Sequence, residues 1–431
     1  MSGTRPTSSS PMRARRWRVP PPLTRAGELL EGAEVLTEVS GETAVLLWKS
    51  LRTVTLWASA GSPDQVDLFT PGARHRRLAE LLTTPVDPEI RLPVETIAAL
   101  LDGPALVRRE SIAVACRQLG HWAASRGARA TEIAFVQAAA LACPYDADLS
   151  LQVARLSHLS GEVARAESWY RRTIMLGRQT GNWTAYSRAF LNLGIAARRR
   201  GNFPTARRFD LKALRSATRH GIVEVRAMAY HDLFSISVEC DDFSTAQRYA
   251  ELAWQAYPRQ HRQVPYLAHD LCALWMREGQ FQRARSVLES LVPLFNEDHR
   301  VVPLASLARA TGGMRDPEAF ERVWSRVVPL LDESGAEGRA AAATPYLAVA
   351  RGATGVGEWE KATTMAERAL EVATKAEEHN MVFEAESLLA FARSRRAIES
   401  PVERGADEPV TRQAEHLAWE MVETFTALAT V

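Results

Sequence analysis

The stretch LNLGIAARRRGNFPTARRFDLKAL, residues 191–214, predicts two helices joined by a tight turn. Gly201 and Asn202 separate two segments whose apolar residues recur at helical spacing. Small residues stand where two helices would cross closely, and large residues stand where a gap between them must be filled. The small ones are Gly194, Ala206 and Ala213, the large ones are Leu193 and Phe203, and Asp210 shares the side of the second helix with Ala206 and Ala213.

The same pattern recurs along the chain. The unit near Leu119 is irregular, because Glu132 stands where a small residue belongs. Another unit is degenerate, and its turn is expected at Gly312-Gly313. Recurrence at this period predicts helix pairs that bury their apolar faces against their neighbours. The residues equivalent to Ala206 are spaced 35 to 43 residues apart: Ala166, Ala206, Ala246, Ala284, Ala319 and Ala362.

This arrangement of small and large residues at fixed offsets resembles the tetratricopeptide repeat. The common form of that repeat is about 34 residues long. The longer spacing here is similar to the family's long-repeat bacterial type, seen in signalling regulators, and to kinesin light chains. The resemblance implies an all-α, right-handed α-solenoid of about seven helix pairs with an extended concave groove.

Composition and charge narrow the classes of function. The 431 residues are 46% hydrophobic and 24% charged, and the net charge of +2 gives no overall attraction to nucleic acid. No apolar run approaches the ~20 residues of a membrane span. The four cysteines form no CxxC pair, so neither zinc nor disulfides are expected and a cytoplasmic location is favoured.

The regions flanking the repeats differ from them in composition. Trp48 and Trp57 precede the repeats and are expected to pack against the first one. Short helices are predicted at Ala73–Leu82 and, after Pro93, at Val94–Leu101. The predicted segments are a disordered basic arm at 1–24, an irregular helical N-terminal cap at 25–105, tetratricopeptide-like repeats at 106–397, and an acidic loop with a C-terminal capping helix at 398–431.

Two features at the ends of the chain leave alternatives open. The arm at 1–24 is either a solvated tail or a contact for nucleic acid or an acidic partner. The last helix carries an apolar stripe, and Glu415, Glu420 and Glu423 lie away from it. We expect those three carboxylates to face solvent.

Two His-Asp-Leu triplets occupy the same place in consecutive repeats. They contain His231 and Asp232, and His269 and Asp270. In the family that the chain resembles, this part of the first helix lines the groove, so stacking would bring the four residues close together. They could then bind a metal or move a proton. The alternative is that they are polar groove residues, or that they hydrogen-bond one repeat to the next.

Basic residues on the preceding first helices predict a preference for acidic peptides. Asn192 matches one residue of the clamp with which some members of the family hold a peptide's terminal carboxylate, but Ile195 departs from the clamp pattern. Arg155, Arg198 and Arg199 could form charge-assisted hydrogen bonds with an acidic peptide. Equally, arginines at 198–200 suit the end of a helix, where cations complement the helix dipole.

The leading hypothesis is therefore a scaffold that binds a protein or peptide in the groove, with no cofactor. The first alternative is a regulatory protein that senses a peptide and controls a partner's activity. The second is a metal-dependent enzyme built on the His-Asp pairs. No phosphate loop of the GxxxxGK[ST] type, no HExxH and no GxSxG elbow is present, so an enzyme is not expected.

Overall fold

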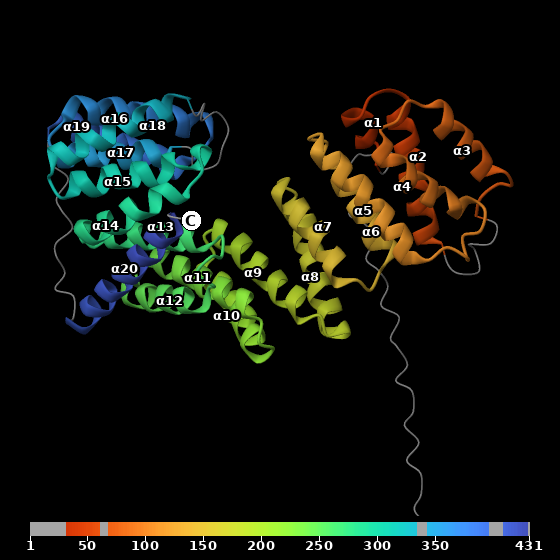
Figure 1. The fold of residues 1–431 in the computed structure, drawn as a ribbon, viewed down its shortest axis with the longest axis horizontal. Helices are drawn as coiled ribbons and strands as arrows, with labels where there is room; N and C mark the ends of the chain where they lie inside the picture. Colours follow the sequence, from red (N-terminus) through yellow and green to blue (C-terminus); the bar gives the residue numbers. More distant parts are fainter. Residues whose placement is uncertain (1–31, 61–67, 334–342, 396–407, 430–431) are drawn as a thin grey trace, which may run out of the picture. The chain divides into compact units, whose positions relative to one another are not determined.

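A computed structural model describes residues 32–60, 68–333, 343–395 and 408–429. All regular structure in these ranges is helical, which confirms the predicted all-α class. The arm at 1–24 and the acidic loop at 398–407 lie outside the described residues. None of the described helices is long and apolar enough to cross a membrane. The chain forms two compact units, residues 1–192 and 193–431, whose helices are coloured along the sequence in Figure 1.

The first unit begins with four helices that precede the repeats. The helix predicted after Pro93 begins earlier, because Pro88 occupies its first position, where a missing N–H costs nothing. Pro93 therefore lies inside that helix, so the prediction of a start at Val94 was wrong. The four are α1 (Glu34–Glu38), α2 (Gly41–Ser59), α3 (Ala73–Thr83) and α4 (Pro88–Ala98), with a 3₁₀ turn at Ala99–Leu101.

The repeats of the first unit comprise α5 (Arg109–Ser125), α6 (Arg129–Ala142), α7 (Ala147–Leu159), α8 (Val163–Thr180) and most of α9 (Trp183–Arg199).

The helices that precede the repeats contact the first repeat. Trp57 of α2 is 1% exposed, donates a hydrogen bond to the Pro104 carbonyl at 3.1 Å, and has the Arg109 guanidinium 4.8 Å from its ring. Both carboxylate oxygens of Glu38 accept hydrogen bonds from backbone N–H groups at the start of α6. The expected packing of Trp57 against the first repeat is confirmed.

The second unit stacks helix pairs so that first helices follow one another. Helix α11 contacts α13, α13 contacts α15, α15 contacts α17, and α17 contacts α19. Its helices are α10 (Phe203–Arg219), α11 (Val223–Glu239), α12 (Phe243–Ala256), α13 (Val264–Arg277), α14 (Phe281–Leu291), α15 (Val301–Gly313), α16 (Pro317–Glu333), α17 (Thr344–Gly355), α18 (Trp359–Lys375), α19 (His379–Arg393) and α20 (Glu408–Ala429), with 3₁₀ turns at Val292–Leu294 and Glu297–His299.

A left-handed residue ends the first helix of each pair at the same register. Glycine fills this place in most pairs because it has no Cβ to clash at positive φ. Three first helices end in other residues: Asp241 and Arg315, both at φ 56°, and Arg395 at φ 49°. The set among the described residues is Gly127, Gly161, Gly201, Asp241, Gly279, Arg315, Gly357 and Arg395.

The expected turn at Gly312-Gly313 was wrong, because both glycines lie in the last turn of α15. Gly312 lets α15 and α17 approach each other closely, whereas Gly313 makes room for the Phe281 ring of α14. A Cβ on Gly312 would overlap the carbonyl oxygen of Gly352, and a Cβ on Gly352 would overlap that of Ala308. The left-handed turn follows at Arg315 instead. The pair that looked degenerate in sequence therefore owes its irregularity to an unusually close helix crossing.

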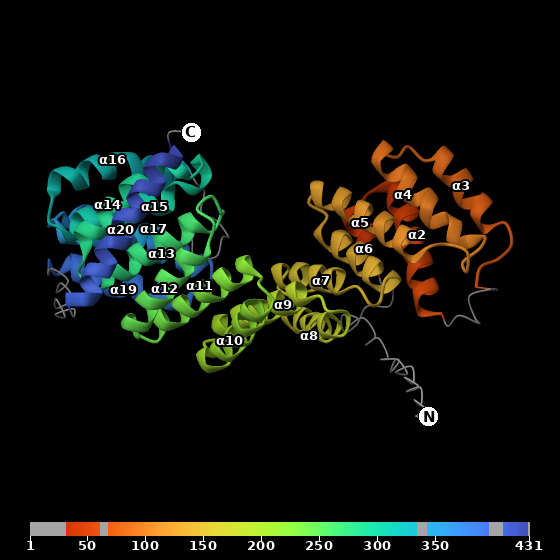
Figure 2. The ribbon, with the colours of Figure 1, turned by 60° about the horizontal axis from the view of Figure 1, so that its bottom comes forward.

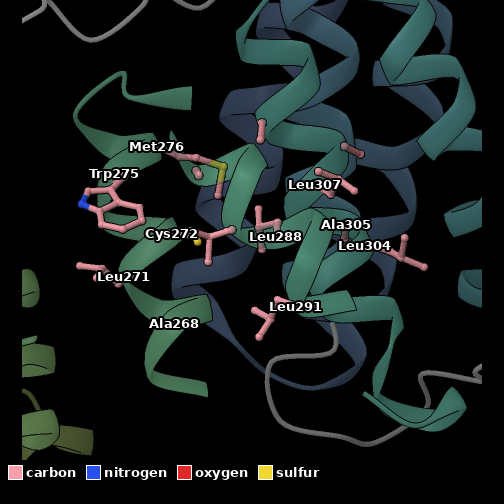
Figure 3. Close-up of a cluster of buried hydrophobic side chains, with 14 of the residues drawn as sticks. Ala268, Leu271, Cys272, Trp275, Met276, Leu288, Leu291, Leu304, Ala305 and Leu307 are labelled. Atoms are coloured by element: carbon pink, nitrogen blue, oxygen red, sulfur yellow. The ribbon is translucent and has the colours of Figure 1, made fainter. Parts of the chain in front are cut away.

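The core of the second unit fills the space between its helix layers. Cys272 stands at the small position that Gly194 occupies in the reference stretch, and it is fully buried. Figure 3 shows it among Leu271, Trp275 and Leu288, side chains that come from α13 and α14. Cys272 is therefore a packing residue of this core.

Helix α20 returns to the middle of the second unit, where it packs on α14 and also contacts α12 (Figure 2). Trp254 of α12 donates a hydrogen bond to Glu420 at 2.8 Å, and the Trp254 ring meets the Phe425 ring edge-on. Arg283 of α14 lies 3.8 Å from Glu415. Glu415 and Glu423 are exposed as expected, whereas Glu420 is half-buried because the Trp254 N–H of α12 binds it.

Candidate functional site

The residues predicted to line a groove divide between the two units. Arg155 on α7 and Asn192 on α9 belong to the first unit. Arg155 is exposed, whereas the Asn192 amide donates a hydrogen bond to the Arg188 carbonyl of its own helix at 2.8 Å. Arg198 and Arg199, at the end of α9, belong to the second unit, as do both His-Asp pairs. Binding by any of these residues stays a prediction.

In the second unit the two His-Asp pairs meet across neighbouring first helices. His231 Nε2 on α11 lies 3.1 Å from Asp270 Oδ2 on α13. His269 Nδ1 lies 3.6 Å from Asp270 Oδ1, and His269 Nε2 lies 2.9 Å from the Ser306 hydroxyl on α15. A line of polar contacts thus crosses three consecutive helix pairs. This geometry matches the alternative in which these residues tie one repeat to the next.

Asp270 is the most accessible member of this line. Its side chain is 47% exposed, against 13% for His231 and 18% for His269. Partial burial acts to raise the pKa of Asp270, but hydrogen bonds with the two histidines, and their charges, leave that pKa below its usual range. Asp270 is therefore an ionised carboxylate that its partners hold in place and solvent still reaches.

A buried carboxyl group lies nearby on the second helix α10. Asp210 is 1% exposed, and its Oδ1 has no hydrogen-bond partner among the described residues. It packs against Gly194 of α9, where a Cβ would overlap the carboxyl group. Burial and then the charge of Asp232 raise the pKa of Asp210 to about 9, and the opposing charge of Arg198 is too weak to prevent this. Asp210 is therefore protonated at neutral pH.

Arg198 faces acids of the protein itself. Burial raises the pKa of Asp232 to about 6, while the charges of His231 and Arg198 act to lower it. Arg198 is half-buried, and its charge acts on Asp210 as well. Its place in this cluster gives it an electrostatic role within the fold. We call His231, Asp232, His269 and Asp270, with the buried Asp210, the acidic stretch.

A basic stretch, defined as Arg277, Arg309 and Arg351, lies on the first helices α13, α15 and α17. Arg277 lies 2.6 Å from Asp241, and Arg351 pairs closely with Glu384 of α19. Arg309 makes no hydrogen bond or ion pair with any residue that the structure describes. Burial, and then the charges of Arg351 and Arg277, lower the pKa of Arg309 to about 10, with Glu384 opposing.

Sequence reasoning missed both Asp210 and Arg309 as groups of interest, although each leaves a signal. Asp210 is a carboxyl at a position that is apolar in the other pairs: Tyr170, Ala250, Leu288, Val323 and Ala366. Arg309 occupies the same repeat position as Arg155 in an earlier pair and Arg351 in the next one. A departure from the repeat pattern thus marks Asp210, whereas recurrence of an arginine marks Arg309.

The described residues offer no group of three or more His, Cys, Asp or Glu side chains placed to hold a metal ion. The His-Asp line uses its ring nitrogens and carboxylate for contacts within the protein instead. An open hollow of about 620 Å³ lies at the surface of the first unit beside Arg117, His121 and Glu132. A hollow of about 550 Å³ lies in the second unit, between α14 and α20, beside Phe281 and Trp419.

No protein-family model matches the chain, and no curated protein matches it. Among solved structures, the Pseudomonas aeruginosa protein pilF is 17% identical, with a TM-score of 0.37 over 64% of this chain and 99% of that one. A signal-transduction ATPase with numerous domains and a tetratricopeptide repeat sensor, from Pyrococcus horikoshii, is 11% identical, with a TM-score of 0.43 over 93% and 66%. The Cut9–Hcn1 assembly of APC/C is 14% identical, with a TM-score of 0.39 over 84% and 58%.

The packing within this chain agrees with the resemblance seen in its sequence. Helix pairs recur, their left-handed turns keep one register, and small residues such as Ala206 and Ala246 are buried where helices cross. The described residues therefore form stacked helix pairs, and their fold is that of a helical repeat. The low TM-scores above add nothing about what such a repeat holds.

Proposed function

We propose that the second unit binds an extended segment of a partner protein along its first helices. One observation supports this above the others. Polar side chains at matching places in α11, α13 and α15 form a continuous line in which the Asp270 carboxylate is ionised and about half exposed. A repeated, partly solvated polar row is what an extended peptide meets as it crosses stacked helices.

The row can discriminate between partners by charge. Asp270 already has two histidine partners, so an incoming donor adds to an ordered carboxylate and does not have to order a mobile one. Preorganisation of this kind reduces the entropy lost on binding. A segment with a donor group facing α13 therefore fits the row better than one with a carboxylate there.

The test compares two charge reversals in the full chain, Asp270→Arg and Glu371→Arg. Glu371 lies on the second helix α18 and its side chain is 48% exposed, so it matches Asp270 in charge and accessibility but not in position. Chemical cross-linking in cell extract, followed by mass spectrometry, identifies partners whose cross-links map to α11, α13 and α15. We expect Asp270→Arg to lose those cross-links and Glu371→Arg to retain them. Cross-links confined to other surfaces, or equal retention by both variants, would contradict the proposal.

A further inference from the structure

Arg309 carries a charge that lacks a partner among the described residues. The residue is half-buried on α15, and no residue that the structure describes hydrogen-bonds or ion-pairs with it. The arginines on either side each have a carboxylate of their own, Asp241 for Arg277 and Glu384 for Arg351. The basic stretch thus has one positive charge more than the acids that face it.

An uncompensated charge in such a place is unfavourable. Removing a guanidinium from water without a partner costs free energy that a neutral side chain of similar length would avoid. The neighbouring arginines add repulsion, which is visible in the lowered pKa of Arg309. The cost falls if an anion from another molecule occupies the site.

The backbone holds two of these arginines close together. Gly312 and Gly352 lie at the crossing of α15 and α17, and a Cβ on either would overlap backbone of the other helix. Arg351 directly precedes Gly352, and Arg309 lies one helical turn before Gly312. Their separation therefore depends on a rigid helix crossing, which favours binding of an anion with little rearrangement.

The basic stretch also continues from the polar row. Ser306, the last member of the row, and Arg309 are three residues apart on α15 and therefore lie on the same side of that helix. Asp270 and Arg277 are two turns apart on α13, about 10 Å along the helix axis. A segment lying on the row can therefore reach the arginines.

We propose that Arg309, with Arg351 beside it, binds one anionic side chain of the partner segment, either a carboxylate or a phosphorylated residue. This rests on the proposed function, since it assigns the chemistry of one contact within that interface. A guanidinium group can donate two parallel hydrogen bonds to either oxyanion. Because Asp241 and Glu384 already neutralise the flanking arginines, the site suits a single anion.

The test measures fluorescence anisotropy of two labelled probes with the full chain, hexaglutamate and a Gly-Ser peptide carrying one phosphoserine. The variants are Arg309→Gln and Arg309→Lys, and the control is Arg326→Gln, which removes an exposed arginine from α16 of the same pair. We expect Arg309→Gln to weaken the preferred probe by about tenfold or more. The affinity of Arg309→Lys should lie between those of Arg309→Gln and the original chain, because lysine cannot bind in a bidentate manner. Arg326→Gln should bind as tightly as the original chain.

Several results would overturn this inference. One is equal affinity of Arg309→Gln and the original chain, and another is an equal loss in Arg326→Gln, which would indicate general charge attraction. Absence of binding by both probes would also overturn it. If any of these occurs while Asp270→Arg still abolishes the cross-links described above, the anion site fails and the proposed function stands. Melting temperatures of the variants confirm folding, and Arg309→Gln should melt no lower than the original chain.

Discussion

Apart from Asp210 on α10, the acidic and basic stretches of the second unit lie on first helices, but their charges are compensated differently. In the acidic stretch, Asp270 has two histidine partners, and the carboxyl of Asp210 takes up a proton. In the basic stretch, Arg309 can do neither, because a guanidinium stays protonated at neutral pH even when its pKa falls to about 10. A buried carboxyl group can thus become neutral by taking up a proton. An arginine stays charged at neutral pH, and only a nearby anion can compensate its charge.

The two stretches also differ in what lies beneath them. Gly194 makes room for the Asp210 carboxyl group, which is a side chain. Gly352 makes room for the backbone of α15. A side chain can shift when space is lost, but helix backbone shifts only with its whole helix. The two glycine positions should therefore respond differently to an added Cβ.

The largest effect is expected at the basic end. Gly352→Ala should destabilise the protein by about 3 kcal/mol, because its Cβ overlaps the Ala308 carbonyl and forces α15 and α17 apart. Gly194→Ala should cost less, and combining it with Asp210→Ala should recover part of the loss. Urea unfolding followed by circular dichroism provides the comparison. If Gly352→Ala and Gly194→Ala lower the free energy of unfolding equally, the contact of Gly352 with backbone is no stiffer than the contact of Gly194 with the Asp210 side chain.

Asp210→Asn should stabilise the protein by on the order of 2 kcal/mol at about pH 8. Asp210 in the folded protein has a pKa raised from 3.8 to about 9, so the folded state keeps a proton that the unfolded state releases. The stability of the original chain therefore falls as pH rises through this window, and asparagine removes that loss. The gain should shrink toward about pH 5. A pH-independent difference in melting temperature would show that Asp210 is not titrating as proposed.

Asp270→Asn should destabilise by about 1 kcal/mol, since the site is half exposed and solvent screens its ion pairs. The pKa of Asp270 is lowered, so its contribution is present above about pH 4 and is lost as pH falls below its usual range. Thermal unfolding of both proteins at neutral and acidic pH should therefore converge at the acidic end. Ser306→Ala, which removes only the far end of the line, should have a smaller effect at neutral pH.

The smallest effect concerns the left-handed turns next to each stretch. Arg315→Gly should stabilise by up to about 1 kcal/mol, because glycine adopts positive φ without the clash that a Cβ creates. Asp241→Gly should gain less, since it also removes the partner of Arg277. Differential scanning calorimetry measures the melting temperatures of Arg315→Gly and Asp241→Gly against that of the original chain. A larger gain at Asp241 would indicate that its ion pair contributes nothing to stability.

Much of the fold could be predicted because repeats constrain their residues locally. Gly201 and Phe203 marked a turn, and the recurrence of alanine placed most of the later helix pairs. Prediction failed where local rules were broken, at Pro93 and at Gly312-Gly313. In both cases a residue that usually ends a helix lies inside one: Pro93 lies inside α4, and Gly312-Gly313 form the last turn of α15.

The candidate site was less predictable. The contacts of His231 and His269 with Asp270 follow from their repeat positions, and the sequence indicated that stacking would bring them together. The contacts that form depend on how far α11, α13 and α15 are shifted along one another. The same shift decides which histidine nitrogen takes part. The path of α20 back to Trp254 and Arg283 joins residues far apart in sequence, and no periodicity encodes that return.

The sequence alone determined the class of fold, the register of the helix pairs and the residues that stand at each small or large position, because these depend on spacing within a single repeat. Tertiary structure decided which charges are compensated. Asp270 and Arg309 are both charged residues on first helices. Among the described residues, the packing of neighbouring helices gives Asp270 two partners and Arg309 none, and the free energy of a charge depends on what surrounds it.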